Sequence, residues 1–297
     1  MIKRLVCILF MLLPISVDAG DYEVGLEAIN NGKYDKALEV FTSPSMKDNA
    51  KAIFLLGIMY ELGMGVEKDI PKYLKHLKQS AELGYTHAQY NLGQLYRTGK
   101  YMKQDLQKAL QWYEKAAEQG DEGAVFNVAL MYYKGDGTEI NKGKALDWFM
   151  KTAMKGHKEA QFNVAMILKS GEVKRSSREE VMYWLKSAAE QFHPEAMYNL
   201  AMIHIQELGT TKDIETAILW LERASEGGYE DATLALGRIF FSKAMKDPAD
   251  KVKGLYYLSR TKKTPGDETE KLIENLKQKM TESEIKSAEA LLESKNK

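Results

Sequence analysis

Hydrophobic and small residues recur along this chain with a fixed period of 36 positions. One copy covers residues 124–159, and the segments on either side of it align without a gap. Each copy opens on alanine, at Ala52, Ala88, Ala124, Ala160, Ala196 and, in a less regular form, Ala232. Self-similarity of this length is typical of a helical solenoid, in which every repeat packs mainly on its neighbours.

Each copy predicts two helices. Counted from the opening alanine, positions 1, 5, 6 and 9 form one apolar stripe, with small residues at 1 and 6 that let a neighbouring helix approach closely. In the second helix, positions 22, 25, 29 and 30 share a face in the same way. The four tryptophans of the chain all stand at position 25: Trp112, Trp148, Trp184 and Trp220. This regularity predicts a packing role for position 25.

Glycines and capping residues mark the ends of these helices. Glycine at position 12 predicts a left-handed C-cap for the first helix, at Gly63, Gly99, Gly135 and Gly171. A second glycine often follows at position 14: Gly65, Gly137 and Gly209. Position 18 holds N-cap residues for the second helix, namely Asp69, Asp105, Asn141, Ser177 and Asp213. Glycine at position 33 ends that helix, at Gly84, Gly120, Gly156 and Gly228.

The first nineteen residues have a different composition. Lys3 and Arg4 precede a short apolar run over residues 5–13, and Val17 and Ala19 place small residues at a cleavage site. This order is typical of a secretory signal peptide, and the run is too short to span a bilayer. We therefore expect an exported protein, periplasmic or secreted; a retained N-terminal anchor is the alternative. The only cysteine is Cys7, so no disulfide is expected after cleavage.

The predicted organisation follows from these patterns. Residues 1–19 form the signal peptide, 20–51 a capping helix pair, 232–265 a degenerate sixth repeat and 266–297 capping helices. Between them lie five repeats, at residues 52–87, 88–123, 124–159, 160–195 and 196–231. Lysine plus arginine and aspartate plus glutamate number 42 each, a balance that argues against a nucleic-acid partner. No apolar stretch in the mature chain is long enough to form an integral membrane segment.

The segment AQYNLGQLYRTGKYMKQDLQKALQWYEKAAEQG, residues 88–120, resembles the Sel-1-like repeat (SLR) family, a branch of the tetratricopeptide repeats. The resemblance extends over residues 52 to about 257. It implies an all-α fold, a right-handed superhelical α-solenoid of antiparallel helix pairs with about 15 helices. Members of the family resemble scaffolds and adaptors that hold protein partners, some in envelope signalling or host contact.

Two columns of the first helices are candidates for binding. Position 4 is asparagine in four successive repeats, and position 3 is aromatic. By the resemblance, the first helices line a concave groove, where amides both donate to and accept from a peptide main chain; the alternative is that these asparagines only join neighbouring helices. The candidate groove residues are Tyr90, Asn91, Gln94, Phe126, Asn127, Leu130, Tyr133, Phe162, Asn163, Met166, Tyr198 and Asn199.

Signals for catalysis are few. Two S-x-x-K strings, at Ser259 and Ser283, lack the partner motifs that acylation at serine requires, and chance explains them better. His157 and His193 share a repeat position, yet two imidazoles alone do not make a metal site, and we expect both to face solvent in loops. His204 replaces the tyrosine of position 9, which predicts a hydrogen-bonded core residue. No cofactor and no metal are expected.

The sequence thus predicts a non-enzymatic scaffold that binds a protein or peptide partner in its groove. The alternative is an envelope enzyme acting on peptidoglycan or β-lactams. The identity of the partner and the oligomeric state are left open by the sequence.

Overall fold

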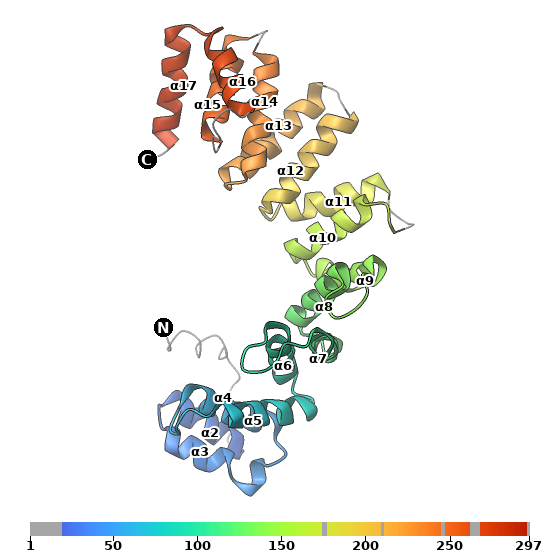
Figure 1. The fold of residues 1–297 in the computed structure, drawn as a ribbon, viewed down its shortest axis with the longest axis vertical. Helices are drawn as coiled ribbons and strands as arrows, with labels where there is room; N and C mark the ends of the chain where they lie inside the picture. Colours follow the sequence, from blue (N-terminus) through green and yellow to red (C-terminus); the bar gives the residue numbers. More distant parts are fainter. Residues whose placement is uncertain (1–19, 174–176, 209–210, 245–246, 262–267, 296–297) are drawn as a thin grey trace. The chain divides into compact units, whose positions relative to one another are not determined.

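The computed structural model describes residues 20–173, 177–208, 211–244, 247–261 and 268–295. Over these ranges it contains 16 α-helices and no strand (Figure 1), which confirms the predicted all-α solenoid class. The chain divides into two compact bodies, Met1–Ile140 and Asn141–Lys297, called here the N-terminal body and the C-terminal body. None of the helices in the described ranges is long and apolar enough to cross a membrane.

The N-terminal body holds seven α-helices and one short 3₁₀ turn within its described residues. They are α2 (Asp21–Asn30), α3 (Tyr34–Phe41), η2 (Pro44–Met46), α4 (Ala50–Leu62), α5 (Ile70–Glu82), α6 (Thr86–Thr98), α7 (Leu106–Glu118) and α8 (Glu122–Lys134). From α4 onward, each helix packs against the next one in sequence, as expected for stacked helix pairs.

The C-terminal body continues the same plan. Its helices are α9 (Lys142–Ala153), α10 (Lys158–Lys169), α11 (Arg178–Ala189), α12 (Pro194–Ile203), α13 (Thr211–Glu226), α14 (Glu230–Lys243), α15 (Pro248–Arg260), α16 (Glu268–Lys277) and α17 (Glu282–Lys295). A π-helical turn, η3 (His204–Leu208), extends α12. Both α16 and α17 pack on α15, and α17 begins with the capping box formed by Thr281 and Glu284, whose backbone amides each bond to the other's side chain.

Small residues bring the helices together where the repeat predicts it. The opening alanines Ala52, Ala88, Ala124, Ala160, Ala196 and Ala232 are completely buried. At position 6, Gly93 faces the ring of Tyr113, and Gly237 faces Leu258 in the same way. The prediction of close helix approach at positions 1 and 6 is confirmed.

The most buried position of the second helices is the one directly after the tryptophans. Position 26 is fully buried in five repeats, at Leu77, Tyr113, Phe149, Leu185 and Leu221. Only Trp184 is buried at position 25, whereas the other three tryptophans are half-buried. In each of these three repeats, the cationic side chain three residues after the tryptophan lies over the indole ring. The pairs are Lys115 on Trp112, Lys151 on Trp148 and Arg223 on Trp220.

The predicted helix ends are largely confirmed. The four glycines at position 12 and the four at position 33 all have positive φ. At position 18, the side chains of Asp69, Asp105, Asn141 and Ser177 accept a backbone N–H three residues later. Asp213 is the exception, because α13 already begins at Thr211, so this residue lies in the first turn rather than at the N-cap.

The glycine at position 14 has a different role from the one at position 12. A Cβ atom on Gly137 would lie 2.4 Å from the backbone of Leu106, and one on Gly65 would lie 2.7 Å from Tyr34. Each glycine therefore lets its loop touch the start of a second helix 31 residues earlier in the chain. Gly209 falls outside the described residues.

Candidate functional site

The candidate groove residues lie on four first helices, α6 and α8 in the N-terminal body and α10 and α12 in the C-terminal body. Gln94 is exposed. The others are half-buried: Tyr90, Asn91, Phe126, Asn127, Leu130, Tyr133, Phe162, Asn163, Met166, Tyr198 and Asn199. The candidate residues thus fall into two groups, one in each body, and each group has side chains that are partly open to solvent.

The aromatic residues of position 3 pack on rings at the end of their own repeat. Phe54 meets Tyr85 edge-on, with ring centroids 5.3 Å apart, and Phe162 stacks on His193 at 4.5 Å. Tyr198 contacts Tyr229 at 5.4 Å. Where position 34 is the aspartate Asp121, Tyr90 packs instead on Tyr113, at 5.5 Å. One side of each of these rings is therefore held by the repeat itself.

Three of the four asparagines of position 4 bond to their own helices. The Nδ2 atoms of Asn127, Asn163 and Asn199 each donate to the carbonyl oxygen four residues earlier, at 2.9, 2.7 and 2.9 Å. A carbonyl accepts only, so this contact fixes which end of the amide faces the helix. The Oδ1 atom is consequently presented as an acceptor on the side away from that bond.

The Oδ1 acceptors differ in what they meet. Asn199 Oδ1 accepts a hydrogen bond from Lys169 Nζ at 3.0 Å, a contact that joins α12 to the end of α10. For Asn127 and Asn163, the described residues provide no hydrogen bond to Oδ1. The asparagine column therefore contains both a structural link and two open acceptors.

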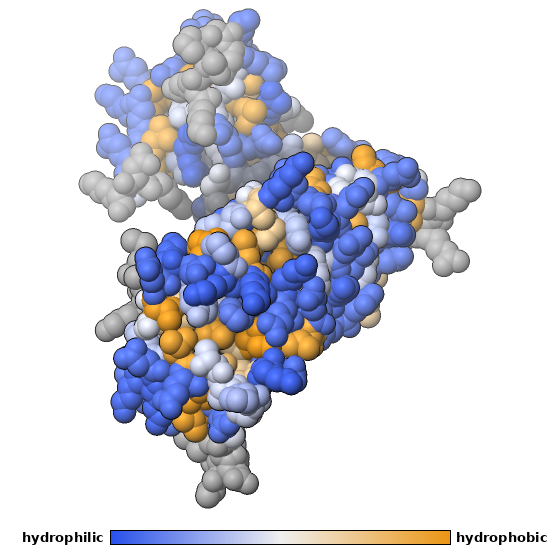
Figure 2. All heavy atoms as spheres, turned by 60° about the horizontal axis from the view of Figure 1, so that its bottom comes forward, coloured by the Kyte–Doolittle hydropathy of each residue, from blue (hydrophilic) through white to orange (hydrophobic). Residues whose placement is uncertain are grey.

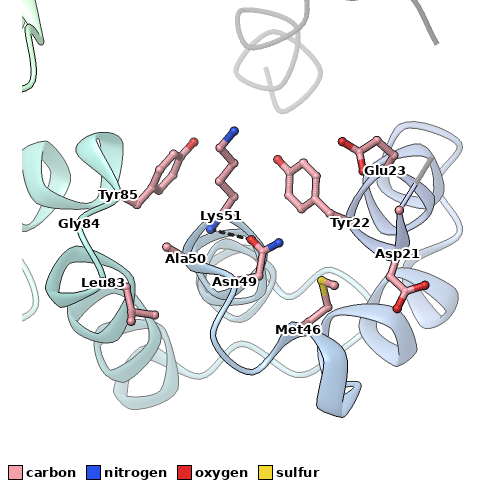
Figure 3. A pocket seen from close by; sticks show the side chains of 11 residues that line it. Asp21, Tyr22, Glu23, Met46, Asn49, Ala50, Lys51, Leu83, Gly84 and Tyr85 are labelled. Carbon is pink, nitrogen blue, oxygen red and sulfur yellow. Dashed lines mark hydrogen bonds between the residues drawn. The ribbon is translucent and has the colours of Figure 1, made fainter. Parts of the chain in front are cut away.

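A pocket of about 610 Å³ lies in the N-terminal body, between the start of α2, the start of α4 and the turn from α5 to α6. Figure 3 shows the Lys51 ammonium group projecting between the hydroxyl ends of Tyr22 and Tyr85, with Met46 and Leu83 lower in the pocket. Burial raises the pKa of Tyr22 to about 12, with Tyr85 and Glu23 adding to the effect, and burial also raises the pKa of Tyr85. Both phenols therefore remain protonated donors at neutral pH.

No sequence pattern indicated this pocket. Tyr22 belongs to the capping pair, which lies outside the 36-residue period, and Lys51 immediately precedes the first repeat. A signal for Tyr85 was present, because a tyrosine or histidine recurs at position 34: Tyr85, His157, His193 and Tyr229.

The histidines differ from expectation. His157 is exposed as predicted, but His193 is buried, because its ring stacks on Phe162 and its Nδ1 accepts the Ala196 N–H at 3.4 Å. His204 is half-buried, and its Nδ1 has no hydrogen-bond partner within the described part of the chain; Asp213 Oδ1 lies 3.5 Å away. Within that part, the hydrogen bond predicted for His204 is therefore not formed. No cluster of metal-ligating side chains occurs among the described residues.

The stacked helix pairs, their glycine ends and their small-residue contacts define a tetratricopeptide-like α-solenoid. The family model described as Sel1 repeat matches five segments, at residues 50–85, 86–121, 123–157, 158–191 and 194–229. These segments cover more than half of the chain, so this chain belongs to the Sel1 repeat family.

Solved structures of related fold support this assignment. A Sel1 repeat protein from Oxalobacter formigenes is 26% identical, with a TM-score of 0.66 over 80% of this chain and 97% of that one. The protective antigen c5321 of uropathogenic Escherichia coli, which displays an SLR fold, is 20% identical, with a TM-score of 0.50 over 92% and 83% of the two chains. None of the curated proteins matches this chain.

Proposed function

We propose that this protein is a non-catalytic scaffold whose first helices, considered separately in each body, bind extended segments of a protein or peptide partner. The observation that carries the proposal is the pair of open amide acceptors, Asn127 Oδ1 and Asn163 Oδ1. Each amide is held in place by its own helix, so little side-chain freedom is lost when a partner binds.

The chemistry of these faces suits a main chain. An open Oδ1 accepts a backbone N–H without regard to the partner's side chains, which gives affinity but little selectivity. Selectivity then comes from the neighbouring positions, which differ between repeats. In the N-terminal body these are Gln94, Leu130 and Tyr133, and in the C-terminal body Met166.

The test begins with crosslinking and pull-down from the native compartment, followed by identification of the partner. Asn127→Ala and Asn163→Ala are each expected to weaken its binding about fivefold, the loss of one hydrogen bond of ordinary strength. Asn199→Ala is the comparison variant and is expected to weaken binding less, because one of the two lone pairs of its Oδ1 already accepts from Lys169. Unchanged affinity in both Asn127→Ala and Asn163→Ala would remove the asparagine column from the binding site.

Export is a second part of the proposal. The basic, apolar and small-residue order of residues 1–19 supports cleavage after Ala19 and a periplasmic or secreted protein in envelope signalling or host contact. Amino-terminal sequencing of the protein recovered from separated cell fractions tests this. A chain that retains Met1 in the membrane fraction would favour an anchor instead.

The alternative function, an envelope enzyme acting on peptidoglycan or β-lactams, has a direct test. Fluorescent penicillin is expected to leave the purified protein unlabelled. Covalent labelling of a serine would overturn the non-catalytic assignment.

A further inference from the structure

We propose that the pocket of Tyr22, Lys51 and Tyr85 binds a monocarboxylate that carries an apolar group. The pocket contains none of the position-4 asparagines, so binding there does not depend on the proposed function.

Three donors without a partner converge at the mouth of this pocket. The Lys51 ammonium group lies between the Tyr22 and Tyr85 hydroxyl groups (Figure 3), and none of the three has a hydrogen bond or ion pair with another described residue. A carboxylate placed there would accept from all of them, and hydrogen bonds to an ionised group are about twice as strong as neutral ones. The start of α4, at Ala50, adds the positive end of a helix dipole to the same wall.

Ring packing holds the two tyrosine donors in position. The Tyr85 ring contacts Phe54 edge-on at 5.3 Å and stacks with His87 at 5.3 Å, and Tyr22 packs near Phe41 with centroids 6.3 Å apart. Tyr22 and Tyr85 therefore keep their places when the pocket is empty. A ligand that meets preorganised donors loses less free energy to ordering the protein.

Below the donors, the apolar side chains of Met46 and Leu83 line the pocket together with the amide of Asn49. Met46 is buried, whereas Leu83 is 47% exposed and lies at the edge of the pocket. An apolar group attached to the carboxylate would cover Leu83, and each methylene removed from water stabilises the complex by about 0.8 kcal/mol. A volume of about 610 Å³ accommodates a ligand the size of a medium-chain acid or a dipeptide.

Acidic residues limit the charge of the ligand. Glu23 and Asp21 line the α2 side of the pocket, and Asp21 Oδ2 already accepts from Ser45 Oγ at 2.7 Å. Their negative charges oppose a second charge on the ligand, which favours a monocarboxylate over a phosphate or a dicarboxylate.

The space-filling view gives the context of this site. Figure 2, which brings the α2–α5 end forward, shows hydrophobic residues in small groups and short bands among hydrophilic ones. Scattered apolar groups of this kind are normal on a soluble surface. The three donors, and not the exposed apolar area, therefore point to a ligand at this pocket.

The test uses calorimetric titration of the purified protein with two acids and their matched amides. The pairs are hexanoate with hexanamide, and N-acetyl-leucyl-leucine with its C-terminal amide. We expect at least one of the two acids to bind at least tenfold more tightly than its matched amide. Tighter binding of hexanoate would indicate a free organic acid, and tighter binding of the peptide acid a chain terminus. Absence of binding by both acids at millimolar concentration, or equal binding of acid and amide, would overturn the proposal.

Variants then assign the contacts. Lys51→Met keeps the length of the stem and removes the charge, and is expected to lower the affinity for the acid at least tenfold, while Tyr85→Phe lowers it severalfold. Lys36→Met, on the exposed face of α3, is the control and is expected to bind like the wild type. Wild-type affinity in Lys51→Met would overturn the proposal, as would equally tight binding of hexyl phosphate. Since Asn127 and Asn163 do not line the pocket, these outcomes leave the test of the partner-binding faces independent.

Discussion

The ring of Phe162 stacks on the imidazole of His193, with centroids 4.5 Å apart and planes inclined by 26°. Phe162 stands near the start of α10, and His193 is the N-cap of α12. The contact thus ties a first helix to the start of the next first helix. Because His193 is buried there, the stability of the C-terminal body is linked to its protonation.

The first prediction concerns pH. Burial lowers the pKa of His193 below its usual value; Glu195 and Glu159 act in the opposite direction, and Lys158 adds to the lowering. In the unfolded chain, where the pKa of a histidine is near 6.5, His193 binds a proton more readily than it does in the folded protein. The contribution of His193 to stability is therefore complete above about pH 6.5 and is lost as the pH falls toward its pKa in the folded state. His193→Asn retains an N-cap acceptor without titrating. In urea denaturation at about pH 8 and about pH 5, this variant is expected to show a smaller loss of stability on acidification than the wild type.

His157→Asn is the matched control, since His157 occupies the same repeat position and is exposed. Its pH dependence is expected to equal that of the wild type. If His193→Asn loses as much stability on acidification as the wild type does, the link to His193 is wrong.

The second prediction concerns the helix contact at Gly93. An alanine Cβ at this position would lie 2.9 Å from Cδ1 of Tyr113, whose ring is fully buried. Gly93→Ala is therefore expected to destabilise the protein by about 1–3 kcal/mol, as overpacked core sites do. Gly143→Ala, where the nearest atom is Asn141 Oδ1 at 3.4 Å, serves as control and should be neutral or slightly stabilising. Denaturant midpoints measure both, and equal midpoints for the two variants would contradict the close contact.

The third prediction separates backbone strain from contact. Gly137 and Gly171 both have positive φ, at 74° and 71°, but only Gly137 has neighbouring backbone, at 2.4 Å; nothing lies within 4 Å of a Cβ on Gly171. Gly171→Ala is expected to cost about 1 kcal/mol from strain alone. Gly137→Ala adds a clash with Leu106 that no side-chain rotation relieves, so its loss in thermal or urea unfolding should be at least about twice as large. Equal losses would show that the loop moves away freely.

The fourth prediction concerns Phe192. It has φ of 59° and is 74% exposed, at the repeat position where the glycines Gly84, Gly120 and Gly156 stand. Phe192→Gly is expected to raise stability by up to about 1 kcal/mol, because relief of the left-handed strain exceeds the greater freedom of glycine in the unfolded chain. The reciprocal change, Gly156→Phe, should lower stability by a similar amount, since nothing lies within 4 Å of its Cβ. A loss of stability in Phe192→Gly would mean that the phenyl ring contributes packing that outweighs its backbone strain.

Periodicity predicted the parts of the fold that every repeat must share. The positions of Ala88 and Gly93 are fixed by helix contact, and the ends at Gly99 and Asp105 by capping chemistry, so residue type alone identified them. The fully buried position 26 was missed, because Leu77, Tyr113 and Phe149 differ in type and only their burial is common. Tryptophan was the more conspicuous residue, yet three of the four tryptophans are only half-buried.

The binding features were less predictable for two reasons. The open acceptors of Asn127 and Asn163 depend on which end of each amide bonds to its own helix, a rotamer choice that residue type does not specify. The donors of the pocket come from segments that the repeat does not relate to one another, since Tyr22 belongs to the capping pair and Lys51 precedes the first repeat. Convergence of such residues follows only from the packing of α2, α4 and the turn before α6.

The contact of Gly137 with the backbone of Leu106 restricts the insertions and deletions that such a chain can accept during evolution. The loop that carries Gly137 must reach a point on the preceding second helix 31 residues earlier, with no space between the two backbones. A single inserted or deleted residue in this loop would displace the glycine from that point. Duplication or loss of a whole 36-residue repeat keeps every such contact in register. The array can thus grow or shrink by entire repeats while the loops inside them keep their length.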